Sequence, residues 1–209
     1  MRIILARHGE TEWNREEIFR GRADVRLNEM GIKQAELLSG YLKDLSIEAI
    51  LSSPLKRAFA TAETIARPHN LMVEKTDGLL DFDYGEWASI TRREAEEKWP
   101  GLYTQWLTAP HLVTMPGGEC LKDIRERALG VINSVTKTYN GTVVLVSHRA
   151  VNKVISCALL GLDDSHFWNI RMDNAAITTF EYQNGAFILA CHNDTSFLKP
   201  LEKPPLRDF

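Results

Sequence analysis

Two histidines follow directly after stretches that have the composition of buried strands. His8 comes after the apolar run at residues 3–6 (IILA), and His148 comes one residue after residues 142–146 (TVVLV). Apolar, β-branched runs of this length predict strands. Because active sites of parallel sheets form beyond the carboxyl ends of the strands, we expect the two histidines to share one edge of a sheet.

A permanently charged arginine is placed in a similar way after a third predicted strand at residues 49–51. Ser53 is a suitable N-cap for the following helix and Pro54 a suitable residue of its first turn, so we expect the helix to begin there. Arg57 then lies in the first helical turn. This brings a positive charge to the same edge of the sheet.

Together these groups match the charge of a phosphate monoester, which is roughly −1.5 to −2 near neutral pH. Arg7 and Arg57 offer forked donors for paired phosphate oxygens. Helix N-termini after Ser53 and His148 add backbone N–H groups. A neutral histidine is also a nucleophile, and a phosphohistidine would split a very slow hydrolysis into two steps.

Strand and helix patterns alternate along most of the chain, which predicts an α/β fold. We expect a three-layer α/β/α sandwich with a mostly parallel central sheet. Residues 183–185 (QNG) between two strand-like stretches predict a hairpin near the end. We expect a single domain over residues 1–209, with a lid-like insertion at about 89–118 and an irregular tail at about 196–209.

Composition excludes several classes of protein. The chain has 209 residues, 44% of them hydrophobic and 25% charged, with a net charge of −3. This balance is typical of a globular domain and argues against nucleic-acid or membrane partners. Three unclustered cysteines predict neither a disulfide framework nor a metal site, and the initial apolar run is short for a signal peptide. We therefore expect a cytoplasmic protein without metal or cofactor.

The stretches ARHGETEWN, LSSPLKRAFATAE and VLVSH, in this order, resemble the histidine phosphatase superfamily, the phosphoglycerate-mutase-like proteins. The resemblance covers roughly residues 1–195. It implies the phosphoglycerate-mutase-like fold and metal-independent phosphoryl transfer through a phosphohistidine. The residue roles that it implies are a nucleophile at His8, phosphate-binding groups at Arg7, Arg57 and His148, a polar pocket residue at Asn14, and a pocket loop at Arg20 and Gly21.

The position of the general acid departs from the family pattern. The family usually carries glutamate in a segment like L-x-E-x-x-x-G-x-W, and counting back from Gly85 and Trp87 places Asp81 there. Aspartate can protonate a leaving oxygen if the pocket raises its pKa. Asp83 is the second candidate, and Glu86 is the third.

A second departure follows His148, where the family commonly has small glycines and this chain has Arg149. Two interpretations stay open. Arg149 either contacts an anionic substrate or points to solvent.

Three functions remain compatible with these residues. The first is a phosphatase that hydrolyses a small phosphate monoester, resembling α-ribazole phosphatase or metal-independent phosphoserine phosphatase. The second is a phosphoglycerate-type mutase, and the third is a phosphate-binding module without catalysis. The substrate stays open between phosphoserine, α-ribazole phosphate and sugar phosphates. A homodimer through an edge strand is also possible.

Overall fold

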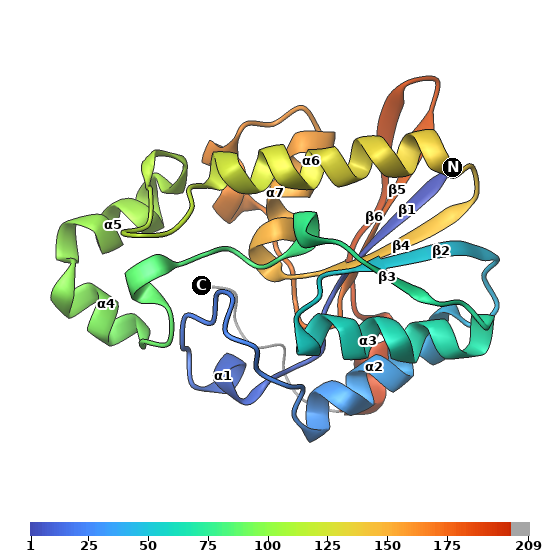
Figure 1. The fold of residues 1–209 in the computed structure, drawn as a ribbon, viewed down its shortest axis with the longest axis horizontal. Helices are drawn as coiled ribbons and strands as arrows, with labels where there is room; N and C mark the ends of the chain where they lie inside the picture. Colours follow the sequence, from blue (N-terminus) through green and yellow to red (C-terminus); the bar gives the residue numbers. More distant parts are fainter. Residues whose placement is uncertain (202–209) are drawn as a thin grey trace.

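The computed structural model describes residues 1–201, which form one six-stranded sheet with helices on both faces (Figure 1). The strands follow the order β3-β2-β4-β1-β5-β6. Their bounds are β1 (Arg2–Arg7), β2 (Ile47–Ser52), β3 (Val73–Lys75), β4 (Thr142–Ser147), β5 (Ile177–Gln183) and β6 (Ala186–Asp194).

The α-helices are α1 (Glu12–Arg15), α2 (Glu29–Leu42), α3 (Lys56–Ala66), α4 (Arg92–Lys98), α5 (Pro100–Thr108), α6 (Leu121–Thr138) and α7 (Arg149–Leu159). The 3₁₀ helices are η1 (Arg67–His69), η2 (Asp77–Leu79), η3 (Gly85–Trp87), η4 (Pro110–Leu112), η5 (Asp164–Asn169) and η6 (Ser196–Leu201). None of the helices within residues 1–201 is long and apolar enough to cross a membrane.

The sheet is mostly parallel, as the sequence predicts. β1, β2, β3 and β4 run in parallel, whereas β5 pairs antiparallel with β1 and β6 pairs antiparallel with β5. Asn184 and Gly185 take positive φ values of 51° and 82° in the β5–β6 turn, which confirms the predicted hairpin. The three-layer α/β/α prediction is confirmed.

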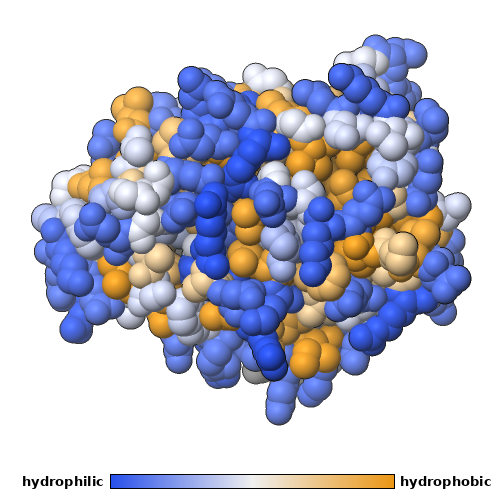
Figure 2. Space-filling view, in the orientation of Figure 1, coloured by the Kyte–Doolittle hydropathy of each residue, from blue (hydrophilic) through white to orange (hydrophobic). Residues whose placement is uncertain are grey.

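Two apolar cores lie on opposite faces of the sheet because successive residues of a strand point to opposite sides. Ile4 and Val144 join the core under α2 and α3. Ile3 and Leu145 join the core under α6 and α7. Between α6 and α3, apolar side chains reach the surface in Figure 2. The central strands are buried on both faces, which explains why their sequences read as continuous apolar runs.

Two local predictions need correction. Helix α3 begins at Lys56 with Leu55 as its N-cap, so Ser53 and Pro54 precede the helix rather than start it. Residues 196–201 form the helix η6 instead of an irregular tail. Phe197 of η6 stacks on Tyr41 of α2, with ring centroids 4.9 Å apart, and this contact holds η6 against the domain. The rest of the predicted tail lies outside the described residues.

Candidate active site

His8 lies just beyond the end of β1, at the carboxyl edge of the parallel strands. Its backbone N–H donates to the carbonyl oxygen of Ser147 at the end of β4, which ties the two strand ends together. Its Nδ1 lies 2.6 Å from the carbonyl oxygen of Gly9. Because a carbonyl only accepts, Nδ1 must carry the proton. Nε2 is then left with a free lone pair, and it has no hydrogen-bond partner within residues 1–201.

The surroundings of His8 keep its ring neutral. The side chain is fully buried. Burial lowers its pKa well below the usual histidine value, and the positive charges of Arg57, Arg7 and Arg20 lower it further. A neutral imidazole with an unprotonated Nε2 is the form of histidine that can attack phosphorus.

His148 stands opposite His8 at the end of β4, where it is the N-cap of α7. The two ring centroids lie 5.2 Å apart. Nε2 of His148 is 2.8 Å from the Oγ of Ser53, and Nδ1 is 3.6 Å from Oδ2 of Asp81. Burial, followed by the charges of Arg57 and Arg20, lowers the pKa of His148 as well.

Arg57 is fully buried and held from three sides. It donates to the carbonyl oxygens of Ala23 at 2.7 Å and Gly21 at 2.8 Å, and to the carboxylate of Asp81 at 2.9 Å. Gly21 takes a positive φ of 50°, which turns its carbonyl toward the guanidinium without strain. The carbonyl of Gly21 therefore anchors Arg57, and Gly21 is not among the residues that line the cavity described next.

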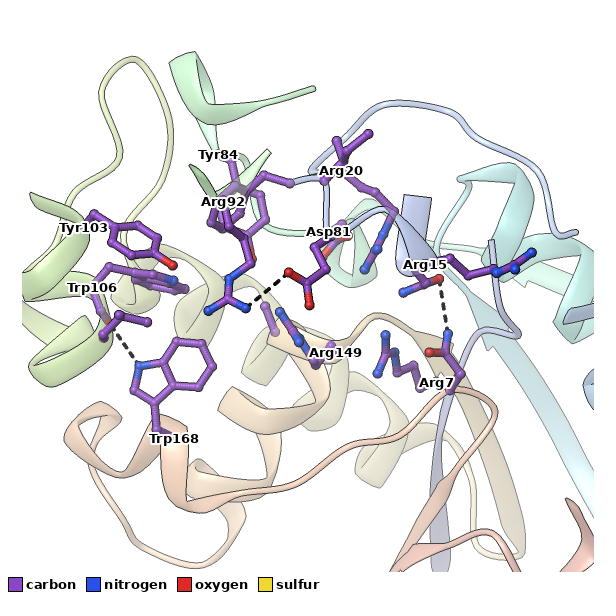
Figure 3. Close-up of a pocket in the computed structure, with 17 residues that line it drawn as sticks. Arg7, Arg15, Arg20, Asp81, Tyr84, Arg92, Tyr103, Trp106, Arg149 and Trp168 are labelled. Atoms are coloured by element: carbon purple, nitrogen blue, oxygen red, sulfur yellow. Dashed lines mark hydrogen bonds and ion pairs between the residues drawn. The ribbon is translucent and has the colours of Figure 1, made fainter. Parts of the chain in front are cut away.

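A cavity of about 130 Å³ opens beside Asp81 (Figure 3), and His8, Arg57 and His148 are not among the residues that line it. Among the residues expected from the sequence, those that line it are Arg7, Asn14, Arg20, Asp81 and Arg149. Arg7 also donates to the carbonyl oxygen of Met172. Aromatic side chains from α5 and η5 close the other end of the cavity, namely Tyr103, Trp106 and Trp168.

The three candidate acids occupy different environments. Asp81 is buried, lines the cavity and faces Arg57 and His148. Asp83 accepts the N–H of Gly85 and pairs with Arg22 at 3.4 Å, outside the cavity lining. The side chain of Glu86 is exposed. Only Asp81 of these three is positioned to meet a leaving group in the cavity.

The arrangement can bind and transfer an anionic phosphoryl group. Its groups are a neutral histidine with a free nitrogen, several buried guanidinium groups and one carboxyl group. Within residues 1–201, no cluster of three or more His, Cys, Asp or Glu side chains could hold a metal ion.

Residues 3–195 match the model of the histidine phosphatase superfamily, branch 1. The chain belongs to this superfamily. It is 38% identical over 199 residues to phosphoserine phosphatase 1 of Hydrogenobacter thermophilus, covering 95% of this chain and 94% of the relative.

Solved structures of relatives have the same fold as this chain. YhfR of Bacillus stearothermophilus superposes with a TM-score of 0.90 at 30% identity, over 94% of this chain and 98% of that one. A mutant phosphoserine phosphatase from Entamoeba histolytica in complex with phosphoserine gives 0.85 at 29% identity, over 94% and 98%. The predicted resemblance to the small phosphatases is confirmed.

Several groups around this histidine phosphatase site were missed by sequence reasoning. Ser53 was assigned to a helix cap, yet its hydroxyl meets His148. Asn174 follows η5 without any pattern, and its Nδ2 lies 3.3 Å from Oδ1 of Asn14. Trp168 belongs to η5, outside any pattern that indicates a site, and it lines the cavity. Only proximity in the fold reveals these roles.

Proposed function

We propose that the protein is a metal-independent phosphatase that hydrolyses a small phosphate monoester through a phosphohistidine at His8. Phosphatase activity is supported by the superfamily match and by the phosphatase relatives. The observation that carries the mechanism is the hydrogen bond from His8 Nδ1 to the carbonyl oxygen of Gly9, because it leaves Nε2 unprotonated, and Nε2 has no hydrogen-bond partner among residues 1–201.

In the first step, Nε2 of His8 attacks phosphorus in line with the leaving oxygen. The P–N bond forms while the P–O bond to the alcohol breaks. Arg7, Arg57 and His148 hold the phosphoryl oxygens as charge shifts among them. Asp81 delivers a proton to the departing alkoxide, so that a neutral alcohol leaves.

In the second step, water replaces the alcohol. The carboxylate of Asp81 accepts a proton from the water, whose oxygen attacks phosphorus. The P–N bond breaks, and its electron pair returns to Nε2 of His8. Inorganic phosphate leaves, and the neutral histidine and the protonated Asp81 are restored together.

Asn14 supports the first step from the side of the cavity. Its Oδ1 accepts from the N–H and the hydroxyl of Thr11, which fixes the orientation of the amide. The Nδ2 group of Asn14 is then the group available to donate to a phosphate oxygen.

Phosphate release from a panel of monoesters in excess chelator tests this function. The panel contains phosphoserine, α-ribazole phosphate, sugar phosphates and a nitrophenyl ester. We expect turnover that survives chelation and is lost in His8→Ala. Turnover that depends on an added metal, or that persists in His8→Ala, would contradict the proposal. Isomerisation of a phosphoglycerate that depends on added bisphosphoglycerate, without release of inorganic phosphate, would favour the mutase.

A further inference from the structure

The segment that carries Asp81 has no regular structure of its own. Residues 80–84 lie between η2 and η3 and belong to neither a helix nor a strand. The carboxylate of Asp81 accepts from Arg57 and from the N–H of Phe82, each at 2.9 Å. Because Phe82 belongs to the same segment, these bonds orient the carboxylate only if the backbone is fixed. Buried carbonyl groups outside secondary structure also need donors from elsewhere in the fold.

Arg127 of α6 supplies these donors. Its guanidinium donates to the carbonyl oxygens of Gly78 at 3.0 Å, Leu80 at 2.7 Å and Asp81 at 3.2 Å. The N–H groups of a guanidinium lie in one rigid plane, so carbonyl oxygens bound to it are fixed relative to one another. One side chain therefore sets the path of the backbone that leads to the acid.

Glu119 holds both Arg127 and the far end of the same segment. Its carboxylate accepts from Nε and Nη2 of Arg127 at 3.1 and 3.2 Å, which is a bidentate pair. Its Oε2 also accepts the N–H of Asp83 at 3.0 Å, and its own N–H donates to the carbonyl oxygen of Asp83 at 2.9 Å. The approach is close, since a Cβ on Gly118 would come 2.3 Å from that carbonyl oxygen. Asp81 thus lies between two anchored points of the backbone.

The ion pair of Arg127 and Glu119 does not reach the substrate cavity. The two side chains are only 18% and 16% exposed. Among the described residues, those that line the cavity include Asp81 but neither member of the pair. Any effect of the pair on turnover must therefore pass through other groups, and Asp81 is the cavity residue whose backbone the pair holds.

We propose that the ion pair of Arg127 and Glu119 positions Asp81 to deliver its proton to the leaving oxygen. The inference rests on the proposed phosphatase function and deepens it by assigning two positioning residues. A general acid must lie within hydrogen-bond reach of the oxygen that it protonates, so a small displacement of the segment slows the reaction.

Two esters of similar size isolate this role in steady-state kinetics. Phenyl phosphate needs a proton on its leaving group more than nitrophenyl phosphate does, because nitrophenolate is the weaker base. We expect Arg127→Met to lower kcat/KM about 10- to 100-fold for phenyl phosphate and less than about threefold for nitrophenyl phosphate. The later attack of water does not affect kcat/KM, which covers the steps up to loss of the alcohol.

A double-mutant cycle tests whether Arg127 acts through Asp81. In an Asp81→Asn background, Arg127→Met should change kcat/KM for phenyl phosphate by less than about threefold, because the proton donor is already absent. A loss as large as in the wild-type background would show that Arg127 acts by another route, and it would overturn the proposal.

Arg125→Met is the matched control. Arg125 lies on the same helix, its side chain is 22% exposed, and it pairs with Asp164 at 2.8 Å. Its removal takes a comparable ion pair from α6 and leaves the contacts of the acid segment in place. Any fall in kcat/KM should be equal for the two esters.

Two milder variants cover a loss of folding in Arg127→Met. Glu119→Gln keeps the shape of the side chain and should lower kcat/KM for phenyl phosphate selectively, about three- to tenfold. Arg127→Lys keeps the positive charge, which also lowers the pKa of His148, but it removes the planar fork. It should still lose about tenfold on phenyl phosphate. Full activity of Arg127→Lys on both esters would assign the effect to charge and overturn the positioning role.

The outcomes distinguish the two proposals. Equal losses on both esters in Arg127→Met and in Glu119→Gln would limit the ion pair to a part in the fold and overturn this inference, while the phosphatase proposal would stand. No phosphate release by the wild type from any monoester would overturn the phosphatase proposal and this inference with it.

Discussion

The guanidinium of Arg57 lies 2.9 Å from the carboxylate of Asp81, and both side chains are buried. The same carboxylate oxygen is 3.6 Å from Nδ1 of His148. The carboxyl group assigned to proton transfer is therefore fixed by two groups assigned to phosphate binding. Movement of a phosphoryl group across the site would change the charge felt by Asp81 directly.

Asp81→Asn tests the role of this carboxyl group. We expect kcat/KM for alkyl phosphates to fall about 10²- to 10⁴-fold, since the leaving alkoxide loses its proton donor. For a nitrophenyl ester, whose leaving group needs no proton, kcat/KM should fall far less. Steady-state kinetics on both esters measure the difference. Asp83→Asn is the matched control, and a larger loss there than in Asp81→Asn would assign the acid to Asp83.

The buried histidines predict the pH dependence of activity. Because burial and Arg57 lower the pKa of His8, its ring stays neutral at and below the ordinary histidine pKa of about 6.5. We expect kcat/KM to show no fall near pH 6.5 from protonation of the nucleophile, and a fall only at lower pH. A pH profile of kcat/KM on a nitrophenyl ester measures this. An acidic limb centred at 6.5 or above would contradict the account.

The same histidines predict acid sensitivity of the fold. His8 and His148 bind protons less readily in the folded state than in the unfolded state. Below about pH 6.5 the unfolded chain takes up more protons, so the free energy of unfolding decreases as the pH falls. Urea unfolding at a series of pH values measures the slope. His8→Gln should make the slope shallower, and an unchanged slope would show that His8 does not contribute.

Ser53 is predicted to position His148, whose Nε2 lies 2.8 Å from the Ser53 hydroxyl. Ser53→Ala should lower kcat about tenfold, the equivalent of one ordinary hydrogen bond. Ser52→Ala is a matched control, because Ser52 is equally buried but donates to the carbonyl oxygen of Ser53, away from the ring. An equal effect of both variants on kcat would assign Ser53 a purely structural part.

Two backbone segments approach each other closely near His8, the proposed nucleophile. A Cβ on Gly31 would come 2.1 Å from the carbonyl oxygen of Glu10, whereas Gly40 in the same helix has nothing within 4 Å. Gly31→Ala should lower the free energy of unfolding by about 1–3 kcal/mol and reduce activity, since the segment beside His8 must shift. Gly40→Ala should raise the free energy of unfolding by roughly 0.5–1 kcal/mol. Denaturant unfolding compares the two, and equal effects would contradict this packing argument.

The sequence predicts the site residues that directly follow strands. His8 and His148 could be assigned because apolar strand patterns are strong and because parallel strands present their carboxyl ends together. Asp81 followed from its spacing to Gly85 and Trp87 within a family pattern. The start of α3 was misplaced because a serine before proline satisfies local capping rules, whereas tertiary contacts gave Ser53 a different partner.

Residues in irregular segments could not be predicted. Trp168 belongs to η5 and Asn174 to the segment before β5, and both reach the cavity only through long-range packing. Gly21 anchors Arg57 through one backbone carbonyl oxygen, and a backbone contact cannot be predicted from the pattern of side chains. Such roles arise from the fold and not from local sequence.

The central claim is that His8 becomes covalently phosphorylated through Nε2. Rapid mixing with labelled phosphoserine, quenching in base and peptide mapping would detect a phosphoryl group that is stable in base and labile in acid. In the wild type, we expect the label on the peptide that contains His8. In Asp81→Asn, mixed with a labelled nitrophenyl ester, the label on this peptide should accumulate. In His8→Ala, the label should be absent. Phosphate release at full rate with no label on His8 would contradict the account.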